Sequence, residues 1–200
     1  MTSILDEDLV RAASDGDLER VRQFLEGGSA PDARDEAGQC ALSMAAARDH
    51  EAVVQLLLDF GADPSGAGAD PTPARAACVM MSARALRLLL AAGARPDESH
   101  KDGQSLLHGV FIADGTRRDS GYLELAKLLL DAGASIDAED RDGATALTRA
   151  VVLNRPESVR WLLLHGANPR LGASQNLSLL EIAKSRKQAE IVRLLTQALG

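Results

Sequence analysis

Aromatic side chains are scarce in this chain, at 2% of its 200 residues. An interior without large rings must be packed from leucine, valine and alanine, and this favours thin layers of helices over a thick core. Cysteine is sparse as well, because the chain contains only Cys40 and Cys78. Two cysteines do not supply the dense framework of a small secreted disulfide fold, so we interpret both as buried thiols.

Long apolar runs and a basic leader are also missing from the sequence. It therefore predicts neither a membrane span nor a secretory signal, and we expect a cytoplasmic protein. Basic residues are outnumbered by acidic ones, which leaves a formal net charge of -7. A negative field repels phosphate backbones and anionic lipids, so we expect neither nucleic acid nor a membrane surface as a partner.

Self-similarity is the feature that the sequence does show. An apolar run that ends in Gly-Ala recurs at 56–63, 88–95, 128–135 and 161–168, with a fainter copy at 24–30. From Gly28 the glycines advance by 33, 32, 40 and 33 residues to Gly61, Gly93, Gly133 and Gly166. Each glycine follows a helical pattern, at the point where a helix end favours a residue that tolerates the left-handed conformation. A second, shorter helix is predicted upstream in each unit, and these helices begin after Cys40, Thr72, Ser105, Thr145 and Ser178.

Several recurring motifs resemble the ankyrin repeat. Asp35–Gly38 and Asp140–Gly143 match its turn, and Thr72-Pro73 and His108 match parts of the helix that follows the turn. The resemblance covers nearly the whole chain and implies an all-α fold, an ankyrin-repeat solenoid of about six stacked helix-turn-helix units with short β-turn tips. We expect a single domain over 1–200, with a cap at 6–34, repeats at 35–66, 67–99, 100–139 and 140–172, and a cap at 173–200.

Two repeats depart from this pattern. Unit 67–99 has Asp70 in place of the turn glycine and Ala74 and Arg75 in place of the family's Leu and His, so we expect it to be the least stable repeat. Unit 100–139 contains an insertion, because Ser105 and Leu128 are 23 positions apart where the other units have 16. The seven extra residues fall within 114–121. They are either a tolerated surface insertion or a contact loop that presents Arg117 and Arg118.

The sequence shows no pattern of residues typical of catalysis, metal binding or cofactor binding. The histidines lack metal-ligand spacing, and the resemblance implies that His50 and His108 form hydrogen bonds within their own repeats. The segment 66–71 has too few glycines for a phosphate loop and follows no predicted strand. We therefore predict no catalytic residues, no metal and no cofactor.

The resemblance implies a protein-binding function on the concave face that loop tips and inner helices form. The tips supply Arg34, Glu36, Gln39, Lys101, Asp102, Gln104, Arg141 and Asp142, and the inner-helix ends supply Arg48, Val79, Met80, Ile112, Val152 and Leu153. The apolar members are either an interface core or side chains half-buried against neighbouring helices. We expect a module that is monomeric when free and acts as a regulator or toxin-neutralising inhibitor. The alternative is a scaffold subunit, and a ligand-binding protein or enzyme is a weaker third hypothesis.

Overall fold

The computed structural model of the protein describes residues 4–66, 68–113, 121–172 and 177–200. Within them lie twelve α-helices and no strand, apart from isolated β-bridges that join Arg34 to Cys40 and Ser99 to Ser105 at loop bases. The predicted all-α class is therefore confirmed. The helices divide between two compact units, Met1–Pro96 and Asp97–Gly200, each with three helix pairs. None of the helices in the described part of the chain has the length and hydropathy to span a lipid bilayer.

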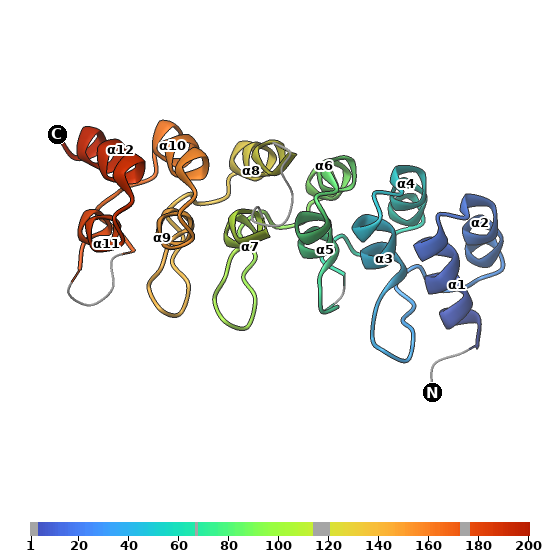
Figure 1. The fold of residues 1–200 in the computed structure, drawn as a ribbon. Coiled ribbons are helices and arrows are strands. Elements are labelled where there is room, and N and C mark those ends of the chain that lie inside the picture. The colour runs from blue at the N-terminus through green and yellow to red at the C-terminus, as the bar shows by residue number, and fades with distance from the viewer. Residues whose placement is uncertain (1–3, 67, 114–120, 173–176) are drawn as a thin grey trace. The chain divides into compact units, whose positions relative to one another are not determined.

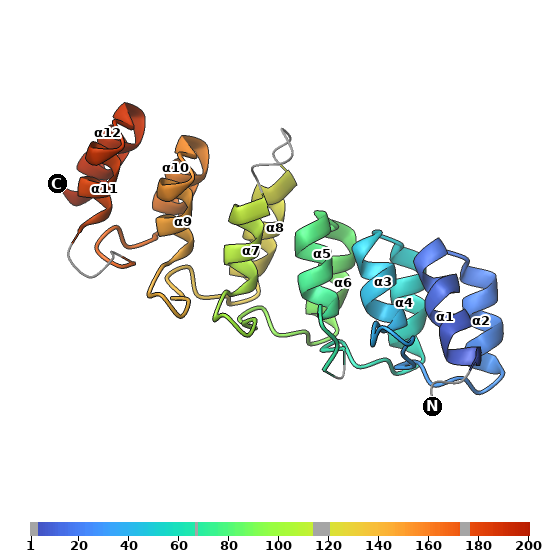
Figure 2. The ribbon, with the colours of Figure 1, turned by 60° about the horizontal axis from the view of Figure 1, so that its bottom comes forward.

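The first unit contains two layers of helices. The inner layer consists of α1 (Ile4–Asp15), α3 (Ala41–Ala47) and α5 (Pro73–Met80), and the outer layer of α2 (Leu18–Glu26), α4 (Glu51–Asp59) and α6 (Ala83–Ala91). Neighbours within each layer are in contact, as are the members of each pair (Figures 1 and 2). The loops that precede α3 and α5 project from the inner layer, on the side opposite α4 and α6 (Figure 1).

The second unit repeats this arrangement. Its inner helices are α7 (Leu106–Ala113), α9 (Ala146–Val152) and α11 (Leu179–Ser185), and its outer helices are α8 (Gly121–Asp131), α10 (Pro156–Leu164) and α12 (Ala189–Leu199). α9 packs against both α7 and α11. The insertion predicted before α8 lies almost entirely outside the described residues, and so do Arg117 and Arg118.

The inner helices begin where their caps predict. The side chains of Cys40, Thr72, Thr145 and Ser178 each accept a hydrogen bond from the backbone N–H three residues later. At Thr145 and Ser178 the side chain of the third residue also bonds back to the cap, which completes a capping box. Because these contacts are local, the sequence alone locates the helix starts.

The two histidines were predicted to bond within their own repeats, and this is wrong for His50. Its Nε2 lies 3.0 Å from the carbonyl oxygen of Ser14, in the preceding helix pair. His108 does contact Ser105 in its own repeat, at 2.8 Å from Nδ1 to Oγ, but its Nε2 lies 2.8 Å from the carbonyl oxygen of Ala144 in the next one. Both rings therefore link neighbouring repeats through Nε2.

Candidate functional site

The loop tip of the first unit presents both structural and exposed side chains. Arg34 is half-buried and donates hydrogen bonds to the carbonyl oxygens of Gly38 and Gly66, at 2.8 and 2.6 Å. It therefore ties its own tip to the next one. Glu36 is exposed, and Gln39 is half-buried with its backbone N–H bonded to the Asp35 carboxylate at 2.8 Å. Of these predicted site residues, Glu36 is the most accessible to a partner.

The tips of the second unit present mostly charged side chains. Lys101, Asp102, Arg141 and Asp142 are exposed, and Gln104 is half-buried. Asp102 accepts a hydrogen bond from the backbone N–H of Gln104 at 3.0 Å, and this bond lowers the pKa of the Asp102 carboxyl. The backbone N–H of Arg141 donates to the carbonyl oxygen of Asp102 at 3.2 Å. The two tips are therefore joined through their backbones.

A buried ion pair supports the second of these tips. The Asp140 carboxylate is almost completely buried, and it bonds to the Arg149 guanidinium and to the backbone N–H groups of Asp142 and Ala144. Burial raises the pKa of the Asp140 carboxyl, but the bonds from Arg149, Ala144 and Asp142 together lower the pKa below its ordinary value. Asp140 is thus a structural residue that holds the turn in place.

Exposed apolar side chains lie at the carboxyl-terminal ends of the inner helices. The exposed fraction is 51% for Val79 and 44% for Met80 in the first unit. In the second unit it is 37% for Ile112 and 42% for Leu153, while Val152 is half-buried. These positions lie seven and eight residues after the helix caps Thr72, Ser105 and Thr145. Arg48 occupies the same position after Cys40 and is also exposed.

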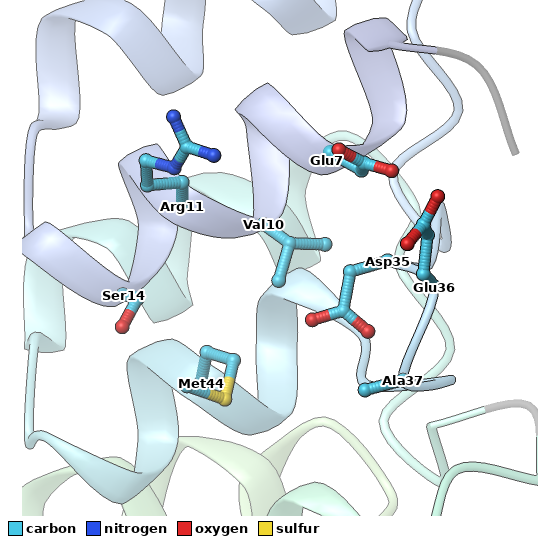
Figure 3. Close-up of a pocket in the computed structure, with 8 residues that line it drawn as sticks. All are labelled: Glu7, Val10, Arg11, Ser14, Asp35, Glu36, Ala37 and Met44. Atoms are coloured by element: carbon cyan, nitrogen blue, oxygen red, sulfur yellow. The ribbon is translucent and has the colours of Figure 1, made fainter.

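The first unit has a pocket of about 370 Å³ between α1, the first loop tip and α3. Figure 3 shows its carboxylates toward the loop and Arg11 on the opposite side. Its lining residues are Glu7, Val10, Arg11, Ser14, Asp35, Glu36, Ala37 and Met44. Only Glu36 among them was predicted as a site residue. The 33-residue period could have identified α1, because it aligns Ala12–Ala13 with Ala45–Ala46 of α3.

The second unit has a pocket of about 360 Å³ between α9, α11 and the preceding tip. Val152, Leu177 and Ile182 supply apolar walls, and the predicted residue Asp142 lies at the rim with Arg186. Arg186 donates to the carbonyl oxygen of Val152 at 2.8 Å, so the basic rim is fixed to the end of α9. The structure therefore brings Asp142 and Val152 together at one hollow.

No group of three or more His, Cys, Asp or Glu side chains in the described ranges is placed to hold a metal ion. His100 contacts Asp102, at 3.2 Å from Nδ1 to Oδ1. Cys40 and Cys78 are both buried, and neither forms a disulfide.

Comparison with known proteins identifies the family. The family model for ankyrin repeats (3 copies) matches residues 9–100, 74–173 and 116–199. The chain is 30% identical over 203 residues to the ankyrin repeat protein YahD of Escherichia coli K12, covering 97% of this chain and 96% of that protein. It is also 30% identical to the mouse B-cell lymphoma 3 protein homolog, but covers only 32% of that protein's length.

A solved structure agrees with these matches. The crystal structure of an ankyrin repeat domain from Acinetobacter baumannii AYE superposes with a TM-score of 0.81 at 27% identity, covering 95% of this chain and 96% of that one. Ankyrin repeats are general protein–protein interaction modules. The predicted fold class is therefore confirmed, and the chain belongs to the ankyrin-repeat family.

Proposed function

We propose that this chain binds a protein partner through the loop tips and inner-helix ends of its repeats. The observation that supports this function is the exposure of Val79, Met80, Ile112 and Leu153 at equivalent positions of three repeats. Exposing large apolar side chains to water is unfavourable, and a protein that presents both these side chains and charged loop tips has the composition of an interface with an apolar core and a polar rim. The protein is not an enzyme under this proposal.

The same proposal includes a role as a cytoplasmic regulator or toxin-neutralising inhibitor that is monomeric until it meets its partner. A scaffold subunit of a larger complex would use the same surfaces. The two roles can be distinguished by the proteins that copurify with the chain. An inhibitor forms a complex of fixed composition with one target, whereas a scaffold is recovered with several subunits.

Met80→Asp combined with Leu153→Asp tests the surface directly. We expect the double variant to keep its helical circular dichroism, since both side chains are more than two-fifths exposed. Affinity for the partner should fall roughly a thousandfold, because each apolar interface anchor is typically worth about 2 kcal/mol. The measurement is recovery of the partner on tagged full-length chain from the source cells, followed by titration of the purified complex.

Leu164→Asp is the matched control. Leu164 is 78% exposed at the end of the outer helix α10, so the substitution has the same chemistry at a site away from the proposed surface. It should leave partner recovery unchanged. Full binding by the double variant, or equal loss in the control, would refute the proposed surface.

A further inference from the structure

The pocket between α1 and the first loop tip combines an apolar floor with carboxylates that form no ion pair with other described residues. We propose that it binds an arginine side chain of the protein partner. This inference rests on the proposed function and specifies the chemistry by which the first unit recognises its target. Figure 3 shows the side chains on which it depends.

The floor of the pocket suits the aliphatic part of a long basic side chain. Val10 is buried, Met44 is half-buried, and both line the pocket from facing helices together with Ala37 of the loop. Arginine commonly packs its methylene stem along such a surface while its guanidinium stays at the polar edge. Methionine also adapts its shape to an incoming group more readily than branched side chains do.

The carboxylates at the polar edge have not been neutralised by neighbouring cations. No ion pair within the described ranges involves Glu7, Asp35 or Glu36. Arg11 also lines the pocket, but its guanidinium lies 3.8 Å from Asp8 on its own helix. The negative charge at this edge therefore has no cationic partner among the described residues and favours a cation from outside.

Ser14 adds a second, independent indication of a ligand. Ser14 is 9% exposed and lines the pocket, yet its hydroxyl takes part in no hydrogen bond among the described residues. Only its carbonyl oxygen is used, by His50. The Ser14 hydroxyl is not among the completely buried polar atoms that lack a partner, so it is open to the pocket, where a bound guanidinium would donate to it.

Charge complementarity favours a basic segment over other occupants. The first unit, residues 1–96, contains fifteen Asp and Glu and nine Arg, so its net charge is 9 − 15 = -6, which is most of the net charge of -7 of the whole chain. The carboxylates do not form a group placed to hold a metal ion. Separated acceptors instead suit the guanidinium, which presents five N–H donors in a rigid plane, better than the point charge of lysine.

A titration of the ¹⁵N-labelled full chain with N-acetylarginine methylamide tests the proposal. We expect saturable shifts confined to amide signals of α1, the first tip and the start of α3. N-acetylcitrulline methylamide has nearly the same shape but no charge, and should produce no saturable shift. The lysine analogue should bind more weakly than the arginine analogue, because it cannot contact separated carboxylates with a planar fork.

Two double variants distinguish arginine binding at this pocket from attraction to the net negative charge of the protein. Glu7→Gln with Glu36→Gln keeps the side-chain shapes and should weaken arginine binding at least about fivefold, the loss expected for two partly exposed ion pairs. Glu19→Gln with Glu26→Gln removes the same charge from exposed positions of α2 and should leave binding unchanged. Equal weakening in both double variants would show that only net charge matters and would overturn the proposal.

Three other results would overturn it: no saturable shift, equal shifts with citrulline, or the same shifts produced by magnesium chloride alone. The result is distinguishable from failure of the proposed function. If arginine does not bind while the partner is still recovered and is still lost from the Met80 and Leu153 variant, only the pocket inference is wrong. If arginine binds but no partner depends on Met80 and Leu153, the proposed surface is wrong.

Discussion

His108 shows how one buried side chain serves two repeats. Because the carbonyl oxygen of Ala144 is only an acceptor, Nε2 must donate to it, and Nδ1 of the neutral ring then accepts from Ser105. Burial lowers the pKa of the His108 imidazole, although the bond to Ala144 and the charge of Asp140 act in the opposite direction. The folded state therefore holds the neutral ring.

This ring makes stability depend on pH in a defined direction. Its pKa is lower in the folded state, so the unfolded state binds the proton more readily, and stability is complete above the unfolded value of about 6.5. We expect the free energy of unfolding to fall as the pH drops below that value, by up to about 1.4 kcal/mol per pH unit until the folded pKa is reached. Urea titrations between pH 7.5 and 5 measure it.

His108→Gln removes the titrating group, so the decrease over this range should become shallower even though the variant is less stable overall. His165→Gln is the control, because it removes an exposed imidazole and leaves the contacts of His108 intact, so the decrease should persist. An unchanged slope in His108→Gln would mean that other groups carry the pH dependence.

At the scale of elements, the loop tips are fixed by backbone contacts as well as by side chains. Gly103 and Gly143 occupy equivalent turn positions in successive tips, with φ values of +82° and +73°. A Cβ at Gly103 would lie 2.7 Å from the backbone nitrogen of Arg141, whereas a Cβ at Gly143 would meet none of the described residues within 4 Å. The two glycines therefore differ only in what their tips pack against.

Gly103→Ala should consequently destabilise the chain more than Gly143→Ala. Both variants incur the cost of a left-handed alanine, about 1 kcal/mol. Gly103→Ala must also displace Arg141, which adds about 1–3 kcal/mol and weakens its bond to Asp102. Chemical denaturation of the two proteins gives the difference directly. Equal losses of stability in the two variants would show that Arg141 moves away from Gly103 without a measurable cost.

At the scale of the whole molecule, stability is distributed unevenly among the repeats. Ala74 of α5 is completely buried at the position that Leu42 occupies in α3 and Leu147 occupies in α9. The smaller side chain buries less apolar surface, and a leucine at such a site is typically worth about 2–5 kcal/mol more than alanine. This difference gives a physical reason for the prediction that unit 67–99 is the least stable.

Hydrogen exchange tests this prediction. Amides of α5 should lose protection before those of the terminal pairs α1–α2 and α11–α12, because local opening follows the local density of apolar contacts. Exchange is measured residue by residue at constant pH on the intact chain. Slower exchange in α5 than in both terminal pairs would show that the packing of neighbouring helices compensates for Ala74.

The sequence by itself determined the family, the period of the repeats, the starts of the inner helices and the equivalence of Val79, Ile112 and Val152. These features depend on cap chemistry and apolar spacing within a few residues, so they are readable along the chain. Only the tertiary structure revealed that Arg34 donates a hydrogen bond to the carbonyl oxygen of Gly66, that His50 bonds to Ser14, and that Glu7 lines a pocket together with Met44. Each of these relations joins groups from successive helix pairs, and their positions depend on how the stacked helices orient individual side chains.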